Sequence, residues 1–282
     1  MRAILSVQSE VAYGHVGHSA AVFPLQRLGF DVWPIHTVQL GHHPGYGQFR
    51  GHLVEPERVA TILDAVLETA PLDHCAGLLV GYLGSSEIGD LVVKALDRLQ
   101  AVHPDFTTLL DPVIGDDGAG VFVREGVPRV IQDQLLPKAG ILTPNRFELA
   151  YLTGCDVDDI DQAKHAAGRL LERGPRLVVA TGLSDPSSPE VLFMLAISET
   201  EQLLIRTPRL SRSFSGTGDA FSALMLGHYL LAPDLRTAFE RAASAIFSVV
   251  ELTEKLGDEE LCLIAAQDVF STPEIRFSAE AI

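Results

Sequence analysis

Short runs of apolar residues alternate along this chain with longer stretches in which apolar positions recur every three to four residues. The short runs predict strands at residues 3–7, 31–35, 77–80, 107–110, 141–142 and 177–180. The periodic stretches predict helices at residues 18–28, 57–68, 88–99, 161–172 and 220–231. Gly29 should end the first helix, and Pro24 should kink it. Strands that alternate with amphipathic helices indicate a three-layer α/β sandwich with a mostly parallel central sheet.

No repeat, low-complexity tract or linker divides the sequence, so we expect a single domain over residues 1–282. The segment at residues 41–51, rich in His, Gly and aromatic residues, has the composition of an ordered loop. The hydrophobic fraction of 47% is sufficient for a large buried core.

The charge and the cysteines narrow the class of protein further. A net charge of −16, without a basic run, argues against a nucleic-acid partner. No apolar run approaches the roughly 18 residues of a membrane span, and the N-terminus lacks the pattern of a signal peptide. Cys75, Cys155 and Cys262 are far apart and form no Cys-x-x-Cys motif. They are typical of reduced thiols in the cytoplasm.

Polar residues follow five of the predicted strands. Because the carboxyl ends of parallel strands meet at one edge of a sheet, where ligands bind, these residues should form one polar strip. Any one of them would also suit an ordinary turn. They are Gln8-Ser9, Gly81-Tyr82, Asp111-Pro112, Thr143-Pro144-Asn145 and Thr181-Gly182.

The sharpest feature is Gly216-Thr217-Gly218-Asp219, directly before the helix predicted at residues 220–231. The two glycines allow the backbone to approach a ligand, and the start of a helix presents unpaired N–H groups, so this segment can hold an anion. Asp219 would lie where a carboxylate can take the proton of an attacking hydroxyl. The same carboxylate would also stabilise the helix as a cap, and both roles stay open. Neither a P-loop nor a Gly-x-Gly-x-x-Gly motif occurs.

This glycine-rich motif resembles the signature of ribokinase-like kinases. Further motifs resemble those of pyridoxal kinases, in family order from residue 3 to about residue 270: residues 8–17 (QSEVAYGHVG), 80–85 (VGYLGS), 110–115 (LDPVIG) and 143–149 (TPNRFEL). The resemblance implies a ribokinase-like fold and transfer of the γ-phosphoryl group of ATP to the 5′-hydroxymethyl group of pyridoxal, which gives pyridoxal 5′-phosphate in vitamin B6 salvage. Pyridoxine and pyridoxamine are further candidate acceptors.

The resemblance also implies roles for individual residues. Asp219 corresponds to the catalytic base, and Gly216, Thr217 and Gly218 correspond to the hole for the transferring phosphoryl group. The substrate would contact Ser9, His43, Pro44, Gly45, Tyr46, Tyr82 and Asp219. ATP would contact Asp111, Thr143, Asn145, Glu148, Thr181, Thr207, Pro208, Arg209 and Leu210. Asp111 and Glu148 would serve Mg²⁺, which prefers oxygen ligands. A monovalent cation, K⁺ by resemblance, and a homodimer are implied as well.

The chain departs from the pyridoxal kinase pattern in one loop. Pro44 stands where these kinases commonly have a threonine, and Leu40 stands where they have a phenylalanine. We therefore expect fewer side-chain hydrogen bonds to the pyridine ring. Arg206, Arg209 and Arg212 would either cover the phosphates or lie in solvent.

Histidines do not suggest a metal centre, because neither His42-His43 nor the pair His15 and His18 has an evident set of further ligands. Three alternative functions stay open. A hydroxymethylpyrimidine kinase of the same superfamily often carries Cys in place of Asp219. A non-catalytic B6-binding protein would have no need of a base, and a purely structural α/β protein would leave the polar strand ends unexplained.

Overall fold

The computed structural model describes residues 2–48, 50–103 and 106–282. The predicted 41–51 loop therefore includes one residue, Phe49, that lies outside the described part. No helix in the described ranges combines the length and the apolar character needed to cross a bilayer.

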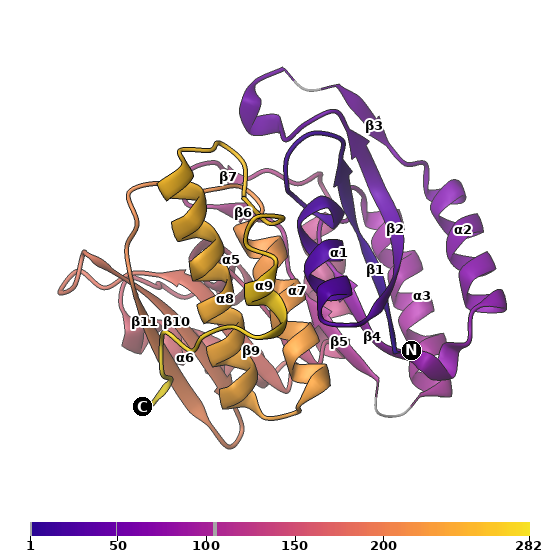
Figure 1. The fold of residues 1–282 in the computed structure, drawn as a ribbon. Helices are drawn as coiled ribbons and strands as arrows, with labels where there is room; N and C mark the ends of the chain where they lie inside the picture. The colour runs from indigo at the N-terminus through magenta and orange to yellow at the C-terminus, as the bar shows by residue number, and fades with distance from the viewer. Residues whose placement is uncertain (1, 49, 104–105) are drawn as a thin grey trace.

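A large sheet forms the centre of the molecule (Figure 1). Within the described residues its spatial order is β12-β11-β10-β9-β8-β5-β4-β1-β2-β3. The parallel strands are β1 (Ala3–Val11), β2 (Asp31–Leu40), β4 (Cys75–Val80), β5 (Thr107–Leu110), β8 (Ile141–Leu142) and β9 (Leu177–Leu183). Antiparallel pairing adds β3 (Gly51–Leu53), β10 (Val191–Ser198), β11 (Gln202–Pro208) and β12 (Glu280–Ala281) at the two sides. A separate small hairpin contains β6 (Gly115–Asp116) and β7 (Gly120–Val121).

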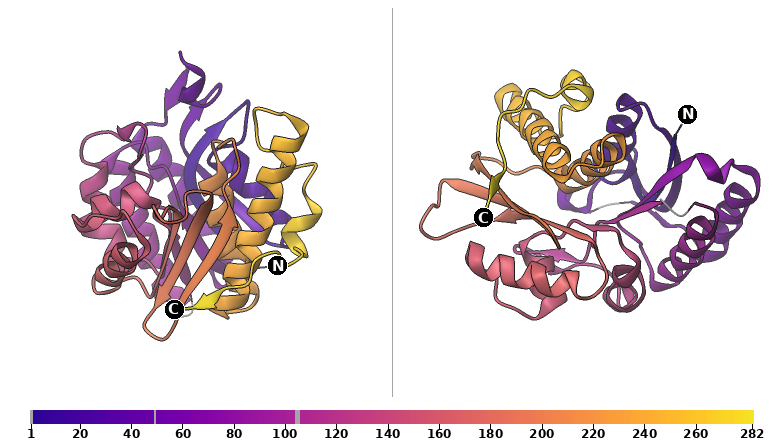
Figure 2. Two further views of the ribbon diagram at one scale, coloured as in Figure 1. Left: turned by 90° about the vertical axis from the view of Figure 1, so that its left-hand side faces the viewer. Right: turned by 90° about the horizontal axis from the view of Figure 1, so that it is seen from below.

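Helices cover both faces of this sheet, and Figure 2 shows the two layers from below. One core cluster packs the sheet against α2 (Pro56–Thr69), α3 (Ser86–Val102), α4 (Val127–Val130), α5 (Arg146–Thr153) and α6 (Ile160–Leu171). The other packs it against α1 (His18–Arg27), α7 (Thr217–Leu231), α8 (Leu235–Leu256) and α9 (Asp268–Ser271). The predicted three-layer sandwich with a mostly parallel sheet is therefore confirmed.

Local sequence explains the elements that were predicted well. Every residue of β4 is buried, which is why this central strand is a continuous apolar run. In α3 the buried positions Ile88, Val92, Ala95, Leu96 and Leu99 follow the helical period. The hydroxyl oxygen of Ser85 caps that helix by accepting a hydrogen bond from the N–H of Ile88.

Two predicted boundaries were wrong. The first strand continues to Val11, so Gln8 and Ser9 lie inside β1 and not after it. Strand β2 continues to Leu40 because its second half still pairs with β1 on one side and with β3 on the other. The sequence patterns also did not predict β10, β11 and α8. Because β11 runs antiparallel to β10, and β10 antiparallel to β9, the carboxyl end of β11 lies at the same edge as those of the parallel strands.

Candidate active site

Backbone hydrogen bonds join the carboxyl ends of neighbouring parallel strands. Each bond links a residue near or just after the end of one strand to the neighbouring strand or to the segment that follows it. Four of the five segments predicted for the polar strip therefore neighbour one another at one edge of the sheet, whereas Gln8-Ser9 lies inside β1. The four bonds run from Gly81 N–H to Val7 O (3.0 Å), from Asp111 to Val80 (2.8 Å), from Thr143 to Leu110 (3.1 Å) and from Thr181 to Pro144 (2.9 Å).

The glycine-rich motif lies against the loop that follows β1. Gly216 immediately precedes α7 and has φ of 82°, a conformation that L side chains rarely adopt. A Cβ atom at this position would lie 1.6 Å from the carbonyl oxygen of His15, so only glycine fits. Thr217 begins the helix, and its hydroxyl donates to the carbonyl of Phe214 at 2.8 Å. The first turn of α7 thus presents free N–H groups beside the polar strip.

Three carboxylates gather at this point. Asp111 follows β5, Glu148 lies in α5, and Asp219 lies in the first turn of α7. Burial, followed by the negative charges of Glu148 and Asp219, raises the pKa of Asp111 well above its usual value. Burial raises the pKa of Glu148 to about 7 and that of Asp219 to about 6, although backbone N–H groups lower both in part. Because the charges of Glu148 and Asp219 both raise the pKa of Asp111, the ionisation of Asp111 depends on the charge state of the other two carboxylates.

A serine that the sequence analysis missed connects this cluster to the strip. The hydroxyl of Ser222 donates to Oδ2 of Asp111 at 2.9 Å, and its oxygen lies 2.9 Å from the hydroxyl oxygen of Thr143. Ser222 is buried and lies three residues after Asp219, on the same face of α7. That spacing was the available signal in the sequence.

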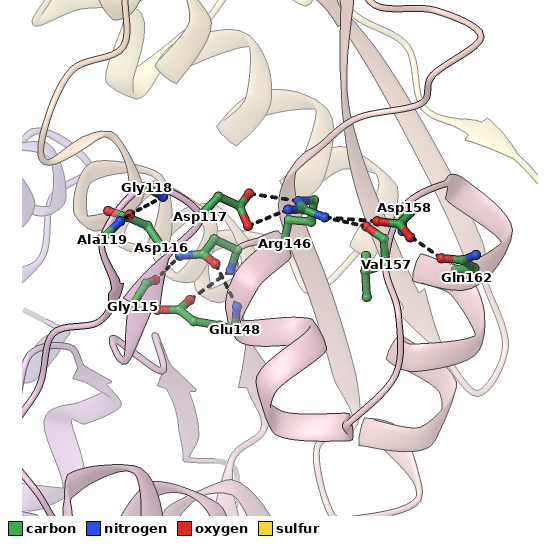
Figure 3. Close-up of polar contacts among 11 residues, drawn as sticks. Gly115, Asp116, Asp117, Gly118, Ala119, Arg146, Glu148, Val157, Asp158 and Gln162 are labelled. Carbon is green, nitrogen blue, oxygen red and sulfur yellow. Dashed lines mark hydrogen bonds and ion pairs between the residues drawn. The ribbon is translucent and has the colours of Figure 1, made fainter.

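Glu148 is held rigidly by backbone groups. Its two carboxylate oxygens accept hydrogen bonds from the N–H groups of Ile114 (3.0 Å) and Asn145 (2.9 Å). The Asn145 side chain completes a capping box at the start of α5 and donates to the carbonyl of Gly115 at 2.8 Å. Figure 3 shows Glu148 and Gly115 beside the ion pair of Arg146 with Asp117, which connects α5 to the β6–β7 hairpin.

The carboxylate cluster has the chemistry of a cation site. The hydrogen bonds that it accepts come from backbone N–H groups and the Ser222 hydroxyl, and none comes from a lysine or arginine of the described ranges. Asp111 and Glu148 are 8% and 3% exposed, so their charges are costly without a counter-ion. Oxygen donors of this kind fit Mg²⁺.

The 41–51 loop lies over the other side of the glycine-rich motif. Nδ1 of His43 accepts from the N–H of Gly45 at 3.1 Å and lies 3.4 Å from the Ser215 hydroxyl oxygen. Pro44 begins a short 3-10 turn, Pro44–Tyr46, in which Tyr46 is 48% exposed. The Tyr46 hydroxyl donates to Glu260 at 2.6 Å.

Glu260, from the segment after α8, was also missed because no local pattern marks it. Its other carboxylate oxygen accepts from the N–H of His15 at 2.8 Å. It therefore fastens the loop after β1 and the 41–51 loop to the C-terminal segment.

The remaining positions expected at the substrate side are close to these elements. Ser9 is buried, and a side chain at Gly17 would collide with it, so β1 and the start of α1 touch here. The backbone N–H of Gly17 in turn favours the ionised form of Asp219. Tyr82 is half-buried, and burial raises the pKa of its hydroxyl.

On the nucleotide side, Thr181 pairs with Asn145 through an isolated parallel bridge. Thr207 is buried at the end of β11, whereas Pro208 and Arg209 are exposed and Leu210 is half-buried. Among the described residues, no hydrogen bond or ion pair joins these four residues to the carboxylate cluster.

The three arginines that precede the glycine-rich motif form ion pairs or hydrogen bonds with residues outside the motif. Arg206 pairs with Glu280, Arg209 donates to the carbonyl of Pro189, and Arg212 pairs with Glu259.

Comparison with known proteins shows similarity to small-molecule kinases. A family model described as phosphomethylpyrimidine kinase matches residues 45–262. The chain is 39% identical over 280 residues to the pyridoxal kinase PdxY of Corynebacterium diphtheriae, covering 99% of both chains. It is 43% identical over 288 residues to the PdxY of Deinococcus radiodurans, covering 100% of this chain and 97% of the relative. It is also similar to the structure of Leishmania donovani pyridoxal kinase in complex with ADP and pyridoxine, with a TM-score of 0.93, 28% identity and 99% of each chain covered.

Proposed function

Because this chain belongs to the pyridoxal kinase family, with the ribokinase-like fold, and is an ATP-dependent kinase, we propose that Asp219 is the base that activates the 5′-hydroxyl of a B6 vitamer for phosphorylation. One observation carries this role. Asp219 lies in the first turn of α7, directly after the glycine-lined Gly216-Thr217-Gly218 segment and beside Asp111. A proton acceptor and an anion-binding backbone are thus adjacent, as phosphoryl transfer requires.

In the proposed reaction the vitamer hydroxyl attacks the γ-phosphorus of ATP. A new bond forms between that oxygen and the phosphorus, the bond from the phosphorus to the bridging oxygen breaks, and ADP leaves. Asp219 takes the hydroxyl proton. The N–H groups at the start of α7 would stabilise the negative charge of the transferring group. Mg²⁺ held through Asp111 and Glu148 would neutralise charge on the phosphates.

We propose the other nucleotide and substrate positions on the same basis. Thr143, Asn145, Thr181 and the segment from Thr207 to Leu210 would contact ATP, because they lie at one sheet edge. Ser9, Tyr82 and residues 43–46 would contact the vitamer, because they surround the Asp219 side of that edge.

Further details of the proposal come from the family resemblance. They are a K⁺ requirement, a homodimer and a cytoplasmic location. The three free cysteines support the location, since reduced thiols are typical of the cytoplasm. An apolar groove of about 670 Å³ between β2 and α2, lined by Trp33, Pro34 and Ile62 among others, supports an interface between copies. Light scattering of the wild type and of Ile62→Glu would test the dimer.

The decisive assay uses purified protein with ATP, Mg²⁺ and each vitamer, with the product followed by chromatography. Asp219→Asn, which keeps the shape of the side chain, should lower kcat by about 10²–10⁴-fold. The matched control is Asp234→Asn, at the start of α8, where the Asp side chain accepts from the N–H of Thr237 and Asn caps equally well. This control should keep wild-type turnover.

Two results would change the assignment. Wild-type turnover in Asp219→Asn would remove Asp219 from the role of base. The name of the matching family model favours a second candidate, a hydroxymethylpyrimidine kinase. Turnover of hydroxymethylpyrimidine without turnover of any B6 vitamer would support that candidate.

A further inference from the structure

A cluster of metal-ligating side chains lies outside the carboxylate site. Glu10, His18 and His36 come from β1, the first residue of α1, and β2. One donor atom from each lies within 4.8 Å of the other two. The sequence has no evident set of further ligands for His18, but the β1–β2 pairing and the position of α1 bring Glu10 and His36 close to it.

The two histidines face each other through their Nδ1 atoms, which are 3.0 Å apart. Nε2 of His18 lies 3.2 Å from the carbonyl oxygen of Ser6 and 3.1 Å from its hydroxyl oxygen. A proton on Nε2 satisfies that carbonyl and leaves the Nδ1 lone pair directed at His36.

The surroundings resemble the outer shell of a metal site. Metal-bound histidines generally donate their second N–H to a carbonyl or carboxylate, and Ser6 provides such a carbonyl for His18. The Ser19 hydroxyl oxygen lies 2.7 Å from the carbonyl of Val11 and 3.2 Å from Oε1 of Glu10, so this carboxylate also lies within hydrogen-bond distance of a polar group. Glu10 and His36 are half-buried and His18 is buried, so an ion can reach the cluster from solvent on one side.

We propose that Glu10, His18 and His36 bind one divalent transition-metal ion, of which Zn²⁺ fits best, with water as the fourth ligand. Two imidazoles and one carboxylate suit Zn²⁺ and Co²⁺, whereas Mg²⁺ prefers oxygen ligands alone. Nitrogen ligands at about 2.0–2.1 Å from a tetrahedral ion are about 3.3 Å apart. The two Nδ1 atoms therefore need to separate by only about 0.3 Å from their present distance.

The bound ion would connect two segments that lead into the active site. Glu10 follows Ser9 directly, and His18 follows Gly17, whose N–H faces Asp219. Fixing the end of β1 to the start of α1 would stabilise the protein, since the ligands come together only in the folded chain.

The test is a titration of the chelator-treated protein with Co²⁺, which shows visible absorption bands in a tetrahedral site. Excess Mg²⁺ is present throughout to occupy the carboxylate cluster. One equivalent of Co²⁺ should bind per chain and raise Tm, and Zn²⁺ should displace it. His36→Asn and Glu10→Gln should each weaken binding by about 100-fold or more and remove the metal-dependent rise in Tm.

The controls separate this site from other candidate ligands. His52→Asn, at an exposed position of β3, and Asp111→Asn should both retain the Co²⁺ spectrum. Both His36 and Glu10 are half-buried, so their variants should fold, and circular dichroism checks this. The absence of a tetrahedral Co²⁺ spectrum in the wild type would mean that the two histidines form a hydrogen-bonded pair only. A spectrum unchanged in His36→Asn would equally overturn the proposal.

Discussion

Ser222→Ala tests the link between α7 and the carboxylate cluster. The Ser222 hydroxyl donates a 2.9 Å hydrogen bond to Asp111, and both side chains are buried, with exposed fractions of 2% and 8%. This bond opposes the rise in the pKa of Asp111 that burial and the neighbouring negative charges cause. Removing the hydroxyl should therefore make Asp111 harder to ionise, and a protonated Asp111 is a poor ligand for Mg²⁺.

The size of the effect follows from the type of bond. A hydrogen bond to an ionised group contributes about 1.5–3 kcal/mol. At about 1.4 kcal/mol for each factor of ten, the Mg²⁺ concentration for half-maximal activity should rise by about 10- to 100-fold. The proton competes with the ion only while Asp111 is partly protonated. The defect should therefore be largest at low pH and shrink as the pH rises.

The assay is kinase activity against Mg²⁺ concentration at several pH values, at saturating ATP and pyridoxal. Ser244→Ala is the matched control, because Ser244 is also fully buried and loses a hydrogen bond, from the N–H of Arg276, but lies in α8. This control should lose about 1 kcal/mol of stability and keep the wild-type Mg²⁺ dependence. Wild-type Mg²⁺ dependence of Ser222→Ala at every pH would refute the reasoning, as would an equal defect in the control.

Three further predictions concern the same site. The kcat/KM of the wild type should fall about tenfold per pH unit below pH 6, because burial raises the pKa of Asp219 to about 6 and a base acts only when ionised; a profile that stays flat to pH 5 contradicts this. Without Mg²⁺, Asp111→Asn should raise Tm at pH 8 by about 2–4 °C, measured by calorimetry. A buried carboxyl whose pKa is raised in the folded protein favours folding at low pH, below its pKa in the unfolded chain. This stabilisation is lost as the pH rises through the raised pKa, because the folded protein must then hold a buried negative charge. If the wild type and Asp111→Asn have the same Tm at pH 8 as well as at pH 5, this prediction is refuted. Tyr46→Phe, which removes the bond to Glu260, should raise the KM for pyridoxal about fivefold with little change in kcat, whereas Tyr151→Phe on α5 should change neither.

The sequence by itself determined the class of fold and predicted where a site would lie. Apolar runs and helical periods depend on interactions between residues close in the chain, so they predicted the central strands and most of the helices that cover them. The polar residues at strand ends and the Gly216 to Asp219 motif predicted a site at one edge of the sheet, since parallel strands have a common direction. The boundaries of β1 and β2 failed because pairing between strands extended both beyond their apolar runs.

Only the tertiary structure decided which side chains meet. Ser222 reaches Asp111 across 111 positions of the chain, and Tyr46 reaches Glu260 across 214. His18 acquires His36 and Glu10 as neighbours because α1 crosses over the β1–β2 pair. The pKa of each buried carboxyl also depends on how deeply packing buries it and on which charges and hydrogen-bond donors packing places beside it. Such contacts produce no periodic pattern in the sequence. Which two residues meet depends on how distant segments pack, and the residues next to each partner in the chain do not determine it.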